Sequence, residues 1–325
     1  MRYGSRIALL LAAASLIAGC ARPALVTGVG NADSQKITQA GAAIQAAAGA
    51  TGPPMLSASA TPDMSVLRRQ LAQYLSRQEG TWGVYLIDLA TGKGTGYNAD
   101  KAFPAASTFK LPMAMYILDL AAQKKASLDE ALTYTEADYE EGTGILQGSI
   151  GPDDEYTVRE LIEFAITHSD NIATNMLLRR FGRANVFAYM NRLGGKVTLF
   201  DEETVGTTPR EMATYMRLLQ SKSGLGDSRL RQFLLKTLSQ TEFADRAAAG
   251  VPEGVRVAHK IGTLPGVVND VAMVFGPEHT FVIACYSMGV DEETAPDVIA
   301  SVTQTVYQAL NPVQAATMDK GPNLQ

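Results

Sequence analysis

Cysteine, histidine and basic clusters are scarce in this sequence, and each scarcity excludes a class of protein. The 325 residues include two cysteines and three histidines, and the formal net charge is -5. Because no basic cluster offsets this acidic balance, neither a nucleic-acid binder nor a membrane-surface binder is indicated. The histidines, His168, His259 and His279, are widely spaced and lack the carboxylate or cysteine companions of a zinc site. We therefore predict packed or surface histidines, no metal and no cofactor.

The two cysteines are expected to have different roles. Cys285 lies in the apolar run 281–286 and is predicted to be a buried free thiol without a disulfide. At the N-terminus, Arg2 and Arg6 precede an apolar run at 7–17 that is too short to span a bilayer comfortably. Residues 17–20 resemble a lipobox, which predicts cleavage before Cys20 and lipidation of its thiol. The alternative is an ordinary signal peptide with a chance cysteine.

Composition divides the chain into four parts. Residues 1–20 are predicted to be a lipoprotein signal peptide, which implies an exported protein anchored at the cell envelope. Residues 21–60 are rich in Ala, Gly, Ser, Pro, Gln and Thr and predict a flexible tether, because they offer little apolar surface to bury. Residues 61–311 form the predicted folded domain, and 312–325 a disordered tail.

The folded part reads as strands near both ends with helices between them. Helical spacing at 64–77 is followed by a predicted strand at 82–88, and three more strands are predicted at 255–261, 267–275 and 280–288. The centre, 107–240, is mostly helical and includes a capping box from Thr157 to Glu160, and a helix is predicted over 295–310. Strands from both ends most simply form one sheet beside the helical centre, an α+β fold in one unit with two lobes.

The segment Ser107-Thr108-Phe109-Lys110 opens an apolar helical stretch. Ser107 is therefore predicted at a helix N-terminus, where backbone N–H groups favour developing negative charge. Lys110, one turn later, lies over the same helix face, and a desolvated amine there could accept the serine proton. Alone, a Ser-x-x-Lys segment is common and weakly informative.

Two further segments are each ambiguous when taken singly. Ser169-Asp170-Asn171 stands between two predicted helices, where a helix N-cap is the ordinary interpretation. Lys260-Ile261-Gly262-Thr263 ends a predicted strand, where a charge and a glycine can simply protect a sheet edge.

Together, in this order, the three segments resemble the class A β-lactamases and penicillin-binding proteins, the penicillin-recognising serine hydrolases. The resemblance covers about residues 61 to 310, including 156–161 and 165–175 around the second segment. It implies an antiparallel sheet flanked by helices with an all-helical lobe inserted, and a β-lactam or an acyl-D-Ala-D-Ala peptide as substrate. The catalytic residues it implies are Ser107, Lys110, Ser169 and Lys260; Asn171, Gly262 and Thr263 are the implied substrate-binding residues.

The sequence departs from the family pattern at the carboxylate-binding end of the site. Ile261 stands where the family usually has Ser or Thr, so recognition of the substrate carboxylate depends on Thr263. Asn269 and Asp270 stand where many class A enzymes have an arginine, which predicts weak binding of penicillins.

A second departure concerns deacylation. The segment 197–209 contains no Glu-x-x-Leu-Asn, and the Ω loop is predicted to be shortened, as in class A-like D,D-peptidases. Glu202 and Glu203 are the possible substitutes for the deacylating base, with Glu203 the candidate and a solvated loop carboxylate the ordinary interpretation.

Three functions remain open on the sequence alone. The first is a serine β-lactamase that deacylates slowly, and the second is a penicillin-binding D,D-peptidase acting on cell-wall peptide. The third is a non-catalytic cell-wall binding lipoprotein, which the joint presence of the nucleophile and its proton relay disfavours. The absence of Gly-x-Ser-x-Gly argues against an α/β-hydrolase. Natural substrate and oligomeric state stay undetermined.

Overall fold

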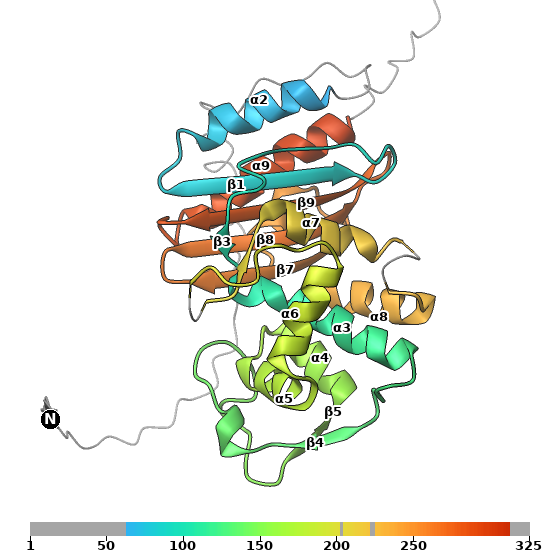
Figure 1. Cartoon of the computed structure of the whole chain (residues 1–325). Helices are drawn as coiled ribbons and strands as arrows, with labels where there is room; N and C mark the ends of the chain where they lie inside the picture. Colours follow the sequence, from blue (N-terminus) through green and yellow to red (C-terminus); the bar gives the residue numbers. More distant parts are fainter. Residues whose placement is uncertain (1–62, 202–203, 222–224, 313–325) are drawn as a thin grey trace, which may run out of the picture. The chain divides into compact units, whose positions relative to one another are not determined.

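A five-stranded antiparallel sheet joins the two ends of the folded domain. The computed structural model describes residues 63–201, 204–221 and 225–312. The strand order is β2-β1-β9-β8-β7, and all neighbours are antiparallel (Figure 1). The strands are β1 (Thr81–Asp88), β2 (Gly94–Tyr97), β7 (Val257–Leu264), β8 (Val267–Phe275) and β9 (Thr280–Met288). Strands from both ends of the chain thus form one sheet, and the α+β prediction is confirmed.

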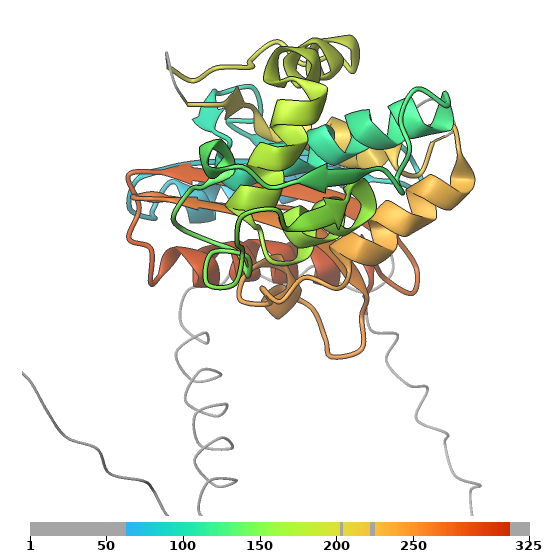
Figure 2. The same ribbon diagram turned by 90° about the horizontal axis from the view of Figure 1, so that it is seen from below.

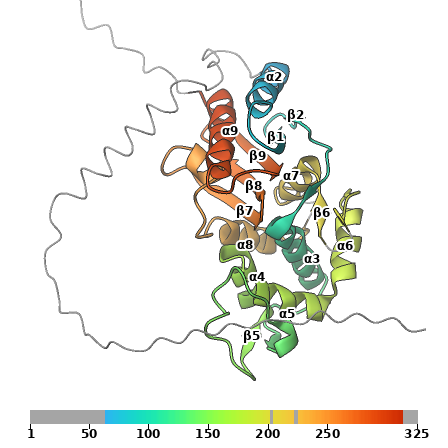
Figure 3. The same cartoon turned by 90° about the vertical axis from the view of Figure 1, so that its left-hand side faces the viewer.

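Helices cover both faces of this sheet. As a result, nearly every position of β8 and β9 is buried. Helices α2 (Met64–Leu75) and α9 (Ala295–Leu310) lie on one face, and α7 (Pro209–Leu218) lies on the other (Figure 3). Helix α2 buries Leu67, Leu71 and Leu75, one residue per turn, in an apolar cluster that also contains the inner side of α9. Fully burying a leucine contributes roughly 2 kcal/mol, so these contacts fix both terminal helices to the sheet.

The helical lobe lies between β1 and β7 in the sequence (Figure 2). Its helices are α3 (Lys110–Ala122), α4 (Val158–Thr167), α5 (Asn171–Phe181), α6 (Arg183–Arg192) and α8 (Ser228–Leu238). The predicted capping box starts α4, with Thr157 and Glu160 bonding each other's backbone amides. Short elements complete the lobe: β3 (Phe103–Pro104) with β6 (Gly206–Thr207), β4 (Ala131–Thr133) with β5 (Glu155–Thr157), and the 3₁₀ turns η2 (Ala106–Phe109) and η3 (Glu136–Asp138). A third 3₁₀ turn, η4 (Ala247–Gly250), packs on α9.

The connection between α6 and α7, residues 193–208, is short and folded back on itself. Leu199 and Val205 form an isolated antiparallel bridge across it. Its base is held by Glu211 in the first turn of α7, whose Oε1 accepts hydrogen bonds from the amides of Lys196 (2.6 Å) and Val197 (3.2 Å). The same carboxylate completes a capping box at the start of α7. One buried side chain therefore holds both ends of the connection, and the shortening of this loop relative to the family stays a prediction.

The three histidines are packed or partly exposed, as predicted, and each is paired with a carboxylate. The partners are far apart in the chain: His168 with Glu242 (2.9 Å), His259 with Asp270 (3.0 Å) and His279 with Asp88 (3.0 Å). Sequence spacing could not reveal these pairs because tertiary contacts make them. Cys285 on β9 is buried with a free thiol, as predicted.

Several predictions lie outside the described residues: the signal peptide 1–20 with Cys20, the tether 21–60, Glu202 and Glu203, and residues 313–325 of the tail. In the part of the chain that the structure describes, no helix is both long and apolar enough to cross a membrane.

Replacing Glu211 by alanine is expected to lower the free energy of unfolding by about 2–3 kcal/mol, because several buried amides lose a charged acceptor at once. Glu160→Ala is the matched control, since Glu160 is exposed, occupies the same capping-box position at the start of α4 and holds no loop; it is expected to cost about 1 kcal/mol or less. Urea denaturation of both variants measures the difference. Equal losses would show that Glu211 does not secure the connection.

Candidate active site

Ser107 lies on a strained turn between β3 and α3. The preceding residue, Ala106, has φ of +47°, a left-handed conformation that costs a non-glycine residue roughly 1 kcal/mol. Ser107 follows in the 3₁₀ turn η2, half-buried, and α3 begins at Lys110, so Ser107 stands at the entrance of this helix as predicted. Tyr286 of β9 supports the turn from below, donating to Thr108 Oγ1 at 2.7 Å.

Asn269 fixes the same turn from the sheet. Its side-chain amide donates to the carbonyl of Pro104 at 2.8 Å, and its Oδ1 accepts from the amide of Ser287 at 3.0 Å. Asn269 is fully buried. The sequence placed Asn269 where an arginine often contacts the substrate, whereas here it fastens the backbone that leads to Ser107.

The edge strand β7 passes directly beside this turn. A Cβ on Gly262 would lie 2.8 Å from the carbonyl oxygen of Ala105 and 3.1 Å from the amide nitrogen of Ser107. Only glycine allows so close an approach without displacing the turn. As β7 is the last strand of the sheet, one of its edges is free of a strand partner. The backbone at Gly262 and Thr263 therefore lies next to the Ser107 amide.

Two buried lysines meet at the hydroxyl of Ser169. Lys260 Nζ donates to Ser169 Oγ at 2.9 Å, and Lys110 Nζ lies 3.4 Å from the same oxygen. Lys110 also donates to the Ser169 carbonyl (2.6 Å) and to Asn171 Oδ1 (2.8 Å). Both lysines and Ser169 are at most 2% exposed. The three sequence segments thus converge, with one residue from α3, one from β7 and two from the α4–α5 junction.

Asp170 holds this junction in place. It is fully buried and is the N-cap of α5, accepting from the amide of Ala173 at 2.8 Å. Its second oxygen accepts from the amides of Ile145 (2.7 Å) and Leu146 (2.9 Å). Ser169 beside it has φ of +53°, so the carboxylate secures another strained residue. The N-cap expected from the sequence is therefore real and also builds the wall of the site.

Burial controls the charge of both lysines. Desolvation lowers the pKa of Lys110 to about 7, against the negative charges of Asp170 and Glu140, which raise it. Desolvation also lowers the pKa of Lys260 well below its usual value, and the positive charge of Lys110 acts in the same direction. Two ammonium groups sharing one buried hydroxyl repel each other, so a neutral amine is available at this site near neutral pH.

A cleft of about 610 Å³ opens in front of Ser107. Lys110, Asn171 and Thr263 also line it, whereas Lys260 and Ser169 are buried behind. Its walls come from the loop 140–143, from residues 204–205 of the short connection and from residues 263–265 after β7. Among the described residues no hydrogen bond joins Ser107 Oγ to Lys110, whose amine is directed at Ser169 and Asn171.

Arg246 is a site residue that the sequence did not reveal. Preceding η4, it is 5% exposed and donates to the carbonyl of Gly262 (3.1 Å), the carbonyl of Asn269 (2.8 Å) and Thr263 Oγ1 (2.8 Å). A guanidinium thus stands beside Thr263 although Asn269 and Asp270 of β8 supply none, and the weak binding of penicillins stays a prediction. Arg246 lies outside the three segments, and a single arginine has no sequence pattern around it that would indicate a site.

No group of three or more His, Cys, Asp or Glu side chains within the described ranges is arranged to hold a metal ion. The arrangement is a hydroxyl on a tight turn, two buried amines, a second hydroxyl between them and the free edge of a strand. Such an arrangement is typical of a serine hydrolase.

The chain belongs to the beta-lactamase enzyme family, whose model matches residues 66–310. It is 30% identical over 245 residues to beta-lactamase AST-1 of Nocardia asteroides, covering 70% of this chain and 78% of that protein. It is 29% identical to a beta-lactamase of Streptomyces albus G, covering 76% and 85%.

Solved structures agree with these relatives. The penicillin G acyl-enzyme of a PBP-A variant has a TM-score of 0.72 at 30% identity, covering 78% of this chain and 98% of that one. An ancestral class A beta-lactamase, GNCA, has a TM-score of 0.69 at 34% identity, covering 75% and 99%. The protein is therefore a serine hydrolase of the class A β-lactamase type, as its motifs predicted.

Proposed function

We propose that this protein opens β-lactams through a covalent acyl intermediate on Ser107 and releases the product slowly. The observation that carries the proposal is the shared hydrogen bonding of Ser169 Oγ to Lys110 and Lys260 beside the Ser107 turn. Such an arrangement places a base, Lys110, and a route for its proton at the cleft that Ser107 also lines. A binding protein would have no use for it.

In the first step the Ser107 hydroxyl attacks the lactam carbonyl carbon. Lys110, with a pKa near 7, takes the hydroxyl proton as the Oγ–C bond forms. The C–N bond of the lactam then breaks, and the leaving nitrogen receives a proton from Ser169, which is replenished from the lysines hydrogen-bonded to it. The proton that leaves Ser107 is thus matched by the proton that the leaving nitrogen receives.

Substrate binding uses the free edge of β7. The backbone amides of Ser107 and Thr263 hold the oxyanion, supported by the close approach of Gly262 to the turn. Asn171, whose Oδ1 accepts from Lys110, hydrogen-bonds the amide of the substrate side chain. Lys260, Arg246 and the Thr263 hydroxyl receive the substrate carboxylate, and Thr263 thereby compensates for the missing hydroxyl at Ile261.

Deacylation is the step that the architecture supports least. The short connection 193–208 closes on itself through Glu211 and carries no Glu-x-x-Leu-Asn. Glu203 is the candidate base for activating water, and it lies outside the described residues. A D,D-peptidase acting on cell-wall peptide is the second candidate function, favoured by this same short connection and by the similarity to PBP-A.

The purified protein is expected to release about one equivalent of product from a chromogenic cephalosporin in a burst, followed by slow turnover, because acylation outpaces hydrolysis. Stopped-flow absorbance gives the burst, and intact-protein mass spectrometry gives the adduct. Ser107→Ala should show neither. Sustained fast turnover without a burst would refute slow deacylation, and an adduct on the alanine variant would refute the nucleophile.

The rate constant of acylation is expected to rise with pH and to level off above about pH 7, because Lys110 must be unprotonated to accept a proton. Single-turnover measurements from about pH 5 to about pH 9 give the profile. Lys110→Arg, permanently charged, should lose activity throughout, whereas Lys125→Arg, in the exposed turn that follows the same helix, should match the parent. A flat profile would exclude Lys110 as the base.

We also propose that the protein is exported and anchored at the cell envelope through a lipid on Cys20. Cys20→Ser is expected to move the protein from the membrane to the soluble fraction, because a single lipidated residue is the only anchor that this proposal contains. Fractionation followed by immunoblotting tests it, with Cys285→Ser as the control that leaves the distribution unchanged. Membrane retention of the Cys20 variant would refute the anchor.

A further inference from the structure

A buried acid–histidine pair lies on the face of the sheet opposite Ser107. Asp270 of β8 and His259 of β7 contact each other through Nδ1, 3.1 and 3.0 Å from the two carboxylate oxygens. Their side chains are 0% and 3% exposed. Cys285 lies opposite Asp270 on the neighbouring strand β9, and it belongs to the apolar cluster under α2 and α9. A charge in such surroundings is costly unless it is paired and hydrogen-bonded.

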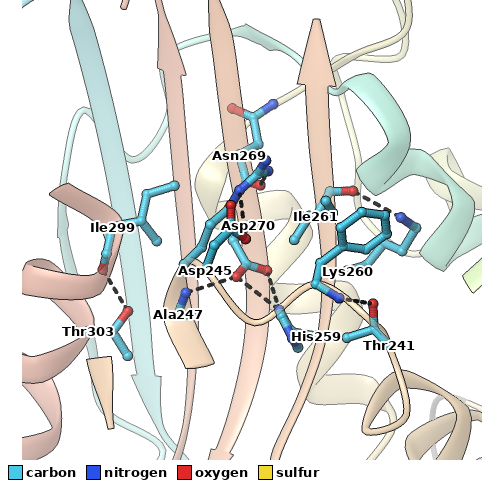
Figure 4. A network of polar contacts seen from close by, with 12 residues as sticks. Thr241, Asp245, Ala247, His259, Lys260, Ile261, Asn269, Asp270, Ile299 and Thr303 are labelled. Carbon is cyan, nitrogen blue, oxygen red and sulfur yellow. Dashed lines mark hydrogen bonds and ion pairs between the residues drawn. The ribbon is translucent and has the colours of Figure 1, made fainter. Parts of the chain in front are cut away.

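The pair is connected to the turn that carries Arg246. Asp270 Oδ2 also accepts from the backbone amide of Ala247, the first residue of η4, at 3.1 Å (Figure 4). Gly250 at the end of η4 packs so tightly on α9 that a Cβ there would lie 2.3 Å from the carbonyl oxygen of Ala300. The carboxylate therefore fixes the backbone at the residue immediately after Arg246, on a turn that has little freedom to move.

Arg246 connects the turn η4 to the cleft. Its guanidinium donates to the Gly262 carbonyl and to Thr263 Oγ1, and Thr263 lines the cleft. Its Nε is buried and has no hydrogen-bond partner; the nearest carboxylate oxygen, on Asp245, is 3.6 Å away. The side chain is thus held mainly by its far end and by the backbone from which it departs. A shift of the Ala247 amide would move the guanidinium relative to Thr263.

We propose that Asp270 and His259 are positioning residues that set the carboxylate-binding end of the cleft through Arg246 and Thr263. Neither contacts the cleft itself. His259 orients the Asp270 carboxylate, Asp270 holds the Ala247 amide, and that amide sets the direction from which Arg246 reaches Thr263. This inference rests on the proposed function, in which Arg246 and Thr263 receive the substrate carboxylate.

The structure contains a matched control for this pair. Asp88 at the end of β1 is 2% exposed and accepts from His279 at 3.0 Å, so it is also a buried aspartate paired with a histidine. None of the cleft-lining residues belongs to this pair. Asp88→Asn therefore imposes a comparable loss of a buried ion pair without acting on Arg246.

The test compares acylation by a chromogenic cephalosporin that has its free ring carboxylate with acylation by the methyl ester of the same compound. For the full-length protein, the second-order rate constant is expected to favour the free acid. Asp270→Asn should reduce this preference at least tenfold by slowing the acid, while the ester rate stays within about twofold. Asp88→Asn should leave the preference unchanged, because a general loss of stability affects both compounds alike.

Two substitutions of His259 keep the test decisive if Asp270→Asn fails to fold. His259→Asn retains a donor near the position of Nδ1 and should preserve the preference, whereas His259→Leu should lower it. Arg246→Ala should lower the preference as Asp270→Asn does, and the double variant should show no further loss if one acts through the other.

The outcomes separate this inference from the function on which it rests. Equal slowing of acid and ester in Asp270→Asn, or an additive double variant, would overturn the positioning role while leaving the enzyme assignment intact. A parent protein that reacts with neither compound would overturn the proposed function and this inference with it.

Discussion

The site depends on placing two lysine amines in the interior against one serine hydroxyl. Neither amine can be fully solvated there, and two charges so close together repel, so burial and proximity both favour loss of a proton. The neutral amine that results is the base of the proposed acylation step. Asp170, buried beside them, supplies the negative charge that limits this effect and keeps the pKa of Lys110 near neutral. The protonation of the two lysines at this site is thus a property of the packing.

The two halves of the fold contribute different parts of this site. The helical lobe provides Lys110 and Ser169, and the sheet provides Lys260, Gly262 and the buried amide of Asn269 that fastens the nucleophile turn. Residues with positive φ stand at both junctions, Ala106 before Ser107 and Ser169 itself. Strain of this kind persists only where surrounding contacts determine the backbone. Here Asn269 and Asp170 supply those contacts from opposite sides of the cleft.

The helices, strands and motifs that local spacing encodes could be predicted from the sequence. Ser107 and Lys110 are one helical turn apart, Asp170 caps the helix that follows it, and the strands alternate or run apolar, so the main elements and the three segments were correctly located. Contacts between distant residues left no such signal. Arg246 reaches Thr263, and His259 reaches Asp270, only after β7 and β8 have paired. The two-residue strands β3 and β6 are likewise products of tertiary packing, not of their own composition.

The closed connection between α6 and α7 also limits how this enzyme could acquire new chemistry. Glu211 is bonded at once to the amides of Lys196 and Val197 and to the start of α7, so residues inserted next to these contacts would disturb an arrangement that the helix itself needs. Substitution is free of this restriction: Thr204 and Val205 already line the cleft, and a side chain exchanged there leaves the closure intact. Single replacements at these two positions can therefore reshape the cleft without loosening the base of the connection.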